Sequence, residues 1–384
     1  MTLNAWSILS ISLLTVMAGA AVAPALGAVQ AAFPDVSPTT IKLLLTAPSV
    51  CIIPMSFLAP RICARLGVRR TLLLGGALYL LGGAGGGLAT SFPMLLATRI
   101  VLGIGVGLVM PMSNSLVSVF FAGEERVRMM GRTASTANLG GIVALFCSGW
   151  LAQANWRYAF AIYAISLVTM TMAALFLQEP PPEQSPAAAT GRLPLGAWLG
   201  ALGLLLLMIV FYCIPTNLAL FLIREGYGEA ANSGMSLAGS TTAGFVAGLI
   251  LPRTRLMFGR QLPLVMLCLM AAGFFCLHYA TGLASAMGGV VLVGFGLGSL
   301  WPSLLVAVAR ATPLPLSMRA MALAGSMIFL GQFLSPLVFD AVGVLLDTRQ
   351  PRDIFGLAGL ATGAAVLGMA LLGRQVRRMM EQRA

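Results

Sequence analysis

Charged residues are scarce in this sequence. Asp, Glu, Lys and Arg make up only 9% of its 384 residues, whereas 59% are hydrophobic. A soluble globular domain carries about 25% charged residues, which cover its surface in water. The composition therefore excludes a soluble domain and predicts an integral membrane protein.

The residue types that usually bind metals or perform catalysis are also few. The chain has one histidine, His278, and six cysteines scattered through apolar stretches without a C-x-x-C pair. Metal sites, disulfide frameworks and Ser-His-Asp catalysis all need clusters of such side chains. We therefore expect no metal, no cofactor and no enzymatic activity.

The charges that are present are mostly positive, and the formal net charge is +12. In a soluble protein such an excess suggests a nucleic-acid partner. Here the 22 arginines and the single lysine gather in short segments between apolar stretches, with no aromatic residues interleaved. We therefore expect them to set the orientation of the chain in a lipid bilayer, and we expect no nucleic-acid partner.

Apolar segments of about 20 residues are long enough to cross the hydrocarbon core of a bilayer. The first such segment resembles part of a signal peptide, but no Lys or Arg precedes it, so we predict a retained span. The predicted spans are 5–30, 40–60, 71–90, 93–118, 133–153, 157–177, 197–222, 231–251, 262–281, 284–309, 320–346 and 353–373. The pattern predicts an all-α membrane protein with twelve transmembrane helices.

One long polar segment, QEPPPEQSPAAATGRLP at 178–194, separates the sixth and seventh spans. Its proline content is typical of a linker. We predict a six-helix bundle at 1–178, a cytoplasmic linker at 179–194, and a second six-helix bundle with a basic tail at 195–384. This arrangement puts 17 Lys and Arg residues on the linker's side and five on the other. The positive-inside rule then places both chain ends in the cytoplasm.

The two predicted bundles repeat each other in sequence. GIGVGLVMP at 103–111 aligns with GFGLGSLWP at 294–302, an offset of 191 residues. The glycine run is not a dinucleotide-binding loop, because it lacks the G-x-G-x-x-G spacing and a preceding strand. Gly103 and Gly107 stand four residues apart on one helix face, so we predict that they allow close packing of helices.

Several motifs resemble those of the major facilitator superfamily. ARLGVRR at 64–70 resembles the loop signature after the second helix, with Arg65, Gly67, Arg69 and Arg70 at matching positions, although Ala64 replaces the acidic residue. RIVLGIGVG resembles the fourth-helix motif, and NWRYAF resembles the signature that begins helix 6. GGIVALFCSGW in the fifth span lacks the proline that is common in antiporters of the family.

The resemblance implies a twelve-helix secondary transporter of two pseudo-symmetric bundles. It also implies that the loop with Arg65, Gly67, Arg69 and Arg70 latches the two halves together on the cytoplasmic side. The usual ion-pair form of this contact needs an acidic residue, and Ala64 stands at that position. Together with the glycines of span 4, these residues are the predicted conformational elements.

Arg99 lies about six residues inside the fourth predicted span. An arginine stays charged there, and an intramembrane charge costs at least ~2.5 kcal/mol, so it should have a partner or face a cavity. One interpretation is a cation that binds an anionic group of the substrate or pairs with a titrating carboxylate. The other is an arginine that reaches the interface or braces neighbouring helices.

Asp340 is the one carboxylate well inside a predicted span. A medium of low dielectric favours the protonated form of such a group, as a proton carrier requires. The alternative is a charge near a helix end that pairs with Arg349 or Arg352. We also predict an interfacial pair of Glu225 with its neighbour Arg224, and an interfacial position for the single histidine.

Uncharged polar and aromatic side chains in the other spans could line a central cavity. Such side chains bind substrates through hydrogen bonds, but serine and threonine often bond their own helix instead. With Arg99, the predicted substrate-binding residues are Asn114, Asn138, Tyr212, Asn217, Trp301 and Gln332.

The sequence therefore predicts a transporter in a bacterial inner membrane, acting as a monomer in the lipid bilayer. The favoured function is proton-coupled efflux of a drug or metabolite by alternating access. Uptake of a small organic anion is the alternative. A membrane sensor or assembly partner that does not transport is less favoured, because the loops are short.

Overall fold

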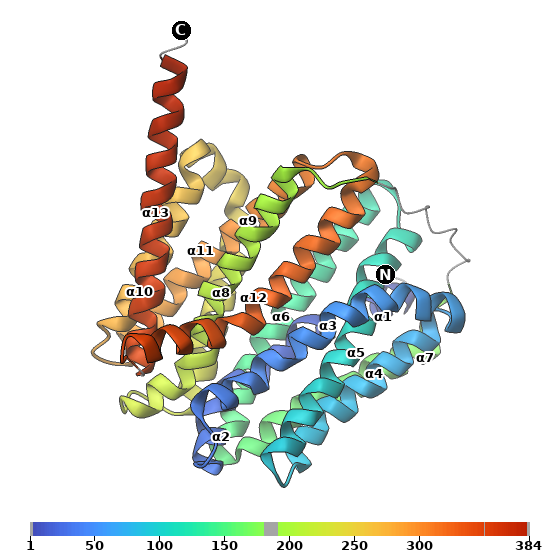
Figure 1. Ribbon diagram of the computed structural model, residues 1–384. Coiled ribbons are helices and arrows are strands. Elements are labelled where there is room, and N and C mark those ends of the chain that lie inside the picture. The colour runs from blue at the N-terminus through green and yellow to red at the C-terminus, as the bar shows by residue number, and fades with distance from the viewer. Residues whose placement is uncertain (1–2, 180–190, 349, 382–384) are drawn as a thin grey trace.

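Figure 1 shows a bundle of long helices. The computed structural model describes residues 3–179, 191–348 and 350–381, with side chains for all of these except 3, 4, 114 and 372–381. No strand occurs in the described part of the chain. Its helices are α1 (Leu3–Ala20), α2 (Leu26–Ala32), α3 (Pro38–Leu66), α4 (Val68–Ala84), α5 (Phe92–Phe120), α6 (Gly123–Ala154), α7 (Ile165–Phe176), α8 (Leu195–Arg224), α9 (Ala230–Phe258), α10 (Leu262–His278), α11 (Leu283–Arg310), α12 (Ser317–Leu345) and α13 (Pro351–Glu381), and the longest of the 3-10 helices, η3 (Trp156–Ala164), leads into α7.

The predicted all-α membrane architecture is confirmed. Eleven stretches of the described residues are helical, long and apolar enough to cross a bilayer. One of them, Ala230–His278, is 49 residues long and contains both α9 and α10. Twelve is therefore the number of spans when these two helices are taken separately.

Serine caps fix where two of the long helices begin. The Ser37 hydroxyl accepts a hydrogen bond from the Thr40 N–H at the start of α3, and Ser91 accepts one from the Met94 N–H at the start of α5. Each cap is followed by a proline within the first two helical positions, where its missing N–H costs nothing. Lys42 consequently lies in the second turn of α3.

The two halves of the chain share helix lengths as well as motifs. α3 and α9 each have 29 residues, and α9 begins 192 residues after α3. α4 and α10 each have 17 residues. The glycine motif occupies equivalent places, because Gly103 of α5 faces Pro48 of α3 and its counterpart Gly294 of α11 faces Ser240 of α9. Gly107 also lies against α3, as the packing interpretation predicts.

Two pairs of long helices join the halves. α3 packs against α12, and α6 packs against α9. We call these contacts the α3–α12 seam and the α6–α9 seam. We also distinguish the linker side of the bundle, where 177–179 and 191–194 lie, from the opposite side, which carries the loops at 33–37 and 225–229 (Figure 1).

Three of the four seam helices, α3, α6 and α9, are buried toward the opposite side and exposed toward the linker side. In α3 the side chain of Ile41 is fully buried, whereas that of Phe57 is 53% exposed. In α6 Ala152 is 3% exposed, whereas Val127 is 70% exposed. The halves therefore meet most closely on the opposite side.

Candidate functional site

An ion pair crosses the α3–α12 seam. The Lys42 ammonium lies 2.5 Å from Oδ1 of Asp340, and the two side chains are only 4% and 13% exposed. Lys42 is the single lysine that we counted above among the residues between spans. That placement is wrong, because α3 begins at Pro38, after the Ser37 cap, and carries Lys42 inside the bundle. The pair therefore neutralises both charges at a buried contact between the halves.

Arg352, one of the two arginines proposed as a partner of Asp340, pairs with Glu225 instead. Arg349 lies outside the described residues. Asp340 is held instead by a lysine that is about 300 residues away in sequence.

The surroundings of the ion pair contain polar atoms without partners. Oδ2 of Asp340, Oδ1 of Asn217 and Oγ1 of Thr46 are all buried and accept no hydrogen bond in the described structure. The Cys213 thiol of α8 is close enough to interact electrostatically with both members of the pair. Because unpartnered buried polar atoms are rare, this cluster has spare capacity for a proton or a polar group.

A neutral hydrogen bond continues the same seam toward the middle of the bundle. Ser49, two helical turns after Lys42, donates through its hydroxyl to Oε1 of Gln332 at 3.0 Å. The amide nitrogen of Gln332 has no partner among the described residues. The predicted substrate-binding residue Gln332 therefore lies at the seam with a free donor.

At the equivalent part of the α6–α9 seam the contact is between backbone atoms, and at the exposed end of that seam the Gln153 amide donates a hydrogen bond to Oε2 of Glu229 at 2.9 Å. Gly149 and Gly234 meet so closely that a Cβ on either one would lie 3.0 Å from the Cα of the other. Gly149 precedes Asp340 by 191 residues and Gly234 follows Lys42 by 192. The glycine contact thus occupies the position in the repeat that the ion pair occupies in the α3–α12 seam.

Arg99 is fully buried inside the first half. Its guanidinium donates to the carbonyl oxygens of Gly82 at 2.6 Å and Gly83 at 2.9 Å, and to the Tyr163 hydroxyl at 3.0 Å. It also lies 4.8 Å from the ring centroid of Phe160, a cation–π contact. Tyr163 donates in turn to Ala18 of α1. This geometry supports the bracing interpretation, since the arginine joins α1, α4, α5 and η3.

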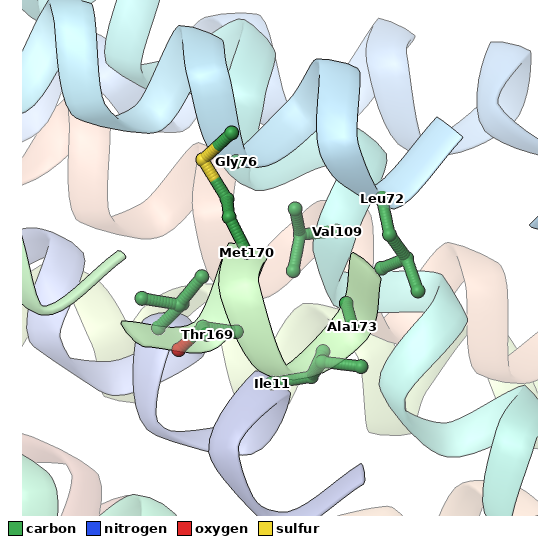
Figure 2. Close-up of a pocket in the computed structure, with 8 residues that line it drawn as sticks. Ile11, Leu72, Gly76, Val109, Thr169, Met170 and Ala173 are labelled. Carbon is green, nitrogen blue, oxygen red and sulfur yellow. The ribbon is translucent and has the colours of Figure 1, made fainter. Parts of the chain in front are cut away.

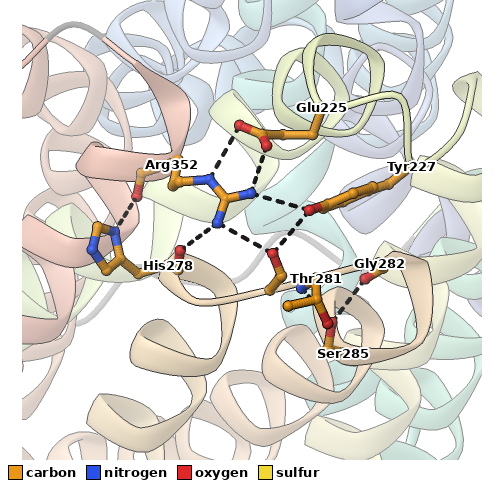
Figure 3. Close-up of polar contacts among 8 residues, drawn as sticks. Glu225, Tyr227, His278, Thr281, Gly282, Ser285 and Arg352 are labelled. Carbon is orange, nitrogen blue, oxygen red and sulfur yellow. Dashed lines mark hydrogen bonds and ion pairs between the residues drawn. The ribbon is translucent and has the colours of Figure 1, made fainter.

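A second arginine network lies on the opposite side of the second half (Figure 3). Arg352 binds both carboxylate oxygens of Glu225, at 3.1 and 2.5 Å, and donates to the carbonyl oxygens of His278 and Ala280. The hydrogen bond from Arg352 lowers the pKa of Glu225 below its usual value. Glu225 therefore pairs with Arg352 and not, as predicted, with Arg224, because the loop turns the carboxylate toward α13.

The loop that resembles the family signature has a carboxylate after all. Glu179, just after α7, accepts hydrogen bonds from the backbone N–H groups of Val68 at 2.5 Å and Arg69 at 3.2 Å. An anion is stabilised at a helix N-terminus, here that of α4. Gly67 has φ +81°, a backbone conformation that favours glycine, and a Cβ there would push the Glu179 carboxylate away from these N–H groups. The exposed side chains of Arg65 and Arg70 flank this turn.

The remaining predicted substrate-binding residues are not gathered at one point. Asn138 bonds the Ala134 carbonyl of its own helix. Asn217 is fully buried and bonds Cys213. Trp301 is 36% exposed on α11. The side chain of Asn114 lies outside the described part of the chain.

Tyr212 lies where α8 approaches α1. Its hydroxyl is 3.9 Å from the place a Cβ on Gly19 would take, and it donates to no described residue. Tyr212 and Gln332 thus combine a position between the halves with a free polar group, as does Asn217 with its buried Oδ1.

A small cavity inside the first half is unsuited to a substrate. Figure 2 shows it between α1, α4, α5 and α7, lined mainly by apolar side chains such as Ile11, Leu72 and Val109. Its volume is about 10 Å³, close to the minimum for a single water. A larger hollow of about 260 Å³ lies near His278 and Asp353, away from both seams.

Sequence reasoning missed Lys42 as a site residue, although signals for it were present. The predicted span 40–60 already included it, and it is the only lysine of the chain. Ser49 follows at a spacing of seven, which places both on one face of a helix. The partner across the seam could not be found from α3 alone.

Comparison with known proteins identifies the fold and the family. The sequence model of the Major Facilitator Superfamily matches residues 7–336. The structure resembles a bacterial homologue of the lysosomal transporter Spinster in an inward-facing conformation, with a TM-score of 0.74, 16% identity and 96% of each chain covered. It resembles a D-xylose-proton symporter equally well, with a TM-score of 0.74, 17% identity and 96% and 95% covered.

The curated relatives match over shorter stretches. The arabinose-proton symporter of Escherichia coli K12 is 30% identical over 118 residues, which cover 30% of this chain and 25% of that protein. The multidrug efflux pump SdrM of Staphylococcus aureus N315 is 28% identical over 138 residues, 34% of this chain and 31% of that protein. These matches span about a quarter to a third of each relative. The family match extends over most of the chain, which belongs to the Major Facilitator Superfamily of membrane transporters.

Proposed function

We propose that this protein is a secondary active transporter that moves a small organic molecule by alternating access. Residues 1–178 and 195–384 would rock against each other as two bundles joined by the linker at 179–194. The two seams support this motion, because they are the main contacts between the halves and are most buried near the opposite side. With the basic residues on the linker side, that side would face the cytoplasm of a bacterial cell, and the protein would work as a monomer in the inner membrane.

Proton coupling would depend on Asp340. The observation that carries this proposal is a carboxylate only 13% exposed, held by a lysine of the other half, with one oxygen buried and unpartnered. A proton on Asp340 changes the charge at the contact between the halves, which is what a coupling step requires. Arg99 is not needed as the counter-charge, because it is bonded within its own half.

The substrate would bind between the halves near Gln332 and Tyr212. Both present polar groups that have no partner among the described residues and that lie on helices of the second half facing the first. A few polar groups in a largely apolar site are typical of small-molecule binding.

We propose efflux of a drug or metabolite as the direction of transport. The partial match to a multidrug efflux pump supports it, while the matches to sugar symporters favour proton coupling without fixing direction. Uptake of a small organic anion is the second candidate, because both charged side chains that are at least nine-tenths buried, Lys42 and Arg99, are cations among the described residues.

The test is flux in proteoliposomes under an imposed pH gradient. Panels of cationic drugs, sugars and small carboxylates are offered to the full chain and to Asp340→Asn. We expect gradient-driven accumulation of one class by the parent, and exchange without accumulation by Asp340→Asn. Accumulation by Asp340→Asn equal to that of the parent would refute the coupling role. Failure of every class to move would count against transport.

A further inference from the structure

The two seams differ at equivalent positions of the repeat. The α3–α12 seam has Lys42 and Asp340, whereas the α6–α9 seam has Gly234 and Gly149 there. At this position of the repeat the first contact contains a carboxylate, which a proton can neutralise, whereas the second contains no ionisable side chain. The α6–α9 seam has a carboxylate too, Glu229, but its hydrogen bond with Gln153 is exposed.

Separation of the halves on the opposite side must break the ion pair. An unpaired ammonium at 4% exposure is unfavourable, because burial removes its hydration without replacing it by a counter-charge. Once Asp340 is neutral, Lys42 is in that position. It regains hydration if α3 and α12 move apart and let water reach it.

We propose that the Lys42–Asp340 ion pair is a proton-sensitive latch that keeps the opposite side closed, with Lys42 as the positioning residue that converts protonation of Asp340 into opening. This inference rests on the proposed transport function and deepens it. The latch is distinct from the cytoplasmic loop signature, which lies at the other end of α3.

One proton is bound and released in each cycle of the latch. It adds to a carboxylate oxygen of Asp340, whose charge falls from −1 to zero, while Lys42 keeps its proton and its +1 charge. Loss of the proton from Asp340 restores the carboxylate and allows the pair to form again. No other group needs to change its charge in this step.

Few other titratable groups are near enough to interfere. On the opposite-side halves of the helices packed around Asp340, the charged or titratable side chains are Lys42 and Cys51 on α3, Tyr212, Cys213 and Arg224 on α8, and Arg352 and Asp353 on α13, while α11 has none there. Arg352 is engaged by Glu225. Cys213 interacts with the pair but is fully buried.

The latch can be tested by the accessibility of one engineered cysteine. Thr46 is fully buried one turn after Lys42, and its hydroxyl has no partner, so Thr46→Cys disturbs little. The variant is made in a full-length chain whose six native cysteines are replaced and whose activity is retained. Cells expressing it are treated with a membrane-impermeant maleimide at external pH 5 to 8. Labelling is divided by that of Asp35→Cys in the exposed loop, which corrects for the pH dependence of thiol reactivity.

We expect the normalised labelling of Thr46→Cys to rise at least tenfold from pH 8 to pH 5. Asp340→Asn should make it high at every pH, because Lys42 then has no counter-charge. Lys42→Met should reverse the pH dependence, with high labelling at pH 8, where Asp340 is charged and unpaired, and lower labelling toward pH 5, where Asp340 is neutral. Exchanging the charges with Lys42→Asp and Asp340→Lys together should restore low labelling at pH 8. As the matched control, Gly149→Ala should raise labelling at every pH while the rise toward pH 5 remains.

The latch would be overturned if normalised labelling of Thr46→Cys were equal at pH 5 and pH 8. It would also be overturned if adding Asp340→Asn left that labelling at pH 8 as low as in the parent. The flux assay separates this failure from failure of the proposed function. Proton-driven flux with labelling independent of pH would leave the transporter intact and remove the latch. Labelling that follows pH without flux of any compound would retain the latch and refute transport.

Discussion

The two halves of this chain have matching helices but place their charges differently. At the seams, an ion pair in α3–α12 stands where α6–α9 has two glycines. Inside the halves, Arg99 braces four elements of the first, whereas the equivalent position in the second is the apolar Val290, which is also fully buried. The shared parts are glycines and helix lengths, which build the scaffold. At these positions the unshared parts are charges, and these are where the two halves can differ in function.

The largest effect is expected from the buried arginine. Arg99→Ala removes hydrogen bonds to Gly82, Gly83 and Tyr163 and leaves a cavity, so it should lower the stability of the purified protein by about 3 kcal/mol or more. Thermal unfolding in detergent measures this. Val290→Ala is the control at the equivalent position and should lose about 1–2 kcal/mol. Normal stability of Arg99→Ala with loss of transport would instead support the substrate-binding interpretation.

A double-mutant cycle measures the interaction between the two charged side chains of the α3–α12 seam. Lys42→Met leaves Asp340 buried without a partner and should cost about 3 kcal/mol, because breaking a buried pair from one side exposes the full desolvation penalty. Lys42→Met combined with Asp340→Leu should recover most of that loss. The measurement is thermal unfolding at pH 7. Additive losses would mean that the two side chains do not interact.

The stability of the α6–α9 seam should depend on side-chain size at its glycines rather than on charge there. A Cβ on Gly234 would lie 2.5 Å from the Leu145 carbonyl oxygen, so Gly234→Ala should cost about 1–3 kcal/mol by overpacking. Gly226→Ala is a poor comparison because of its positive φ, whereas Gly288→Ala has open space and should be nearly neutral. Equal melting temperatures for Gly234→Ala and Gly288→Ala would show that the seam is looser than described.

The smallest effect concerns the loop network around Arg352. Since the folded-state pKa of Glu225 is lowered, its pairing stabilises the protein above the carboxyl's ordinary pKa of about 4.5. The stabilisation is lost as pH falls through the folded-state value. Glu225→Gln should therefore cost about 1 kcal/mol at pH 7 and almost nothing at the acid end of the range. A difference that persists unchanged down to pH 3 would contradict this.

Much of the architecture could be predicted from the sequence because it depends on local patterns. Hydrophobic length located the spans, and the glycine spacing of 103–107 located a packing face that the structure places against α3. Each of these features can be recognised from the sequence of a single helix. The repeat at an offset of 191 then related the second half to the first.

The site was harder to predict because it depends on contacts across the chain. Arg99 was noticed, but its partners on α4 and η3 could not be seen from α5, and so a cavity remained as plausible as a brace. Lys42 was counted among the loop cations although the predicted span 40–60 included it, because its partner Asp340 lies on a helix about 300 residues away in sequence. The loop signature lacks its acidic residue, and the carboxylate bound to this loop comes instead from Glu179, which is more than 100 residues away from the loop in sequence.

Arg157 and Arg352 have a mechanical consequence. Each stands near the start of the sixth span of its half, and each donates to carbonyl oxygens of a loop between the third and fourth spans, Arg157 to Gly87 and Ala89. Each half is therefore held together at the same edge by an arginine that binds backbone carbonyl groups of that half. In the proposed rocking motion, each half would then change little internally, and the rearrangement would be concentrated at the two seams. A single ionisable side chain at a seam, such as Asp340, would then act on both halves together.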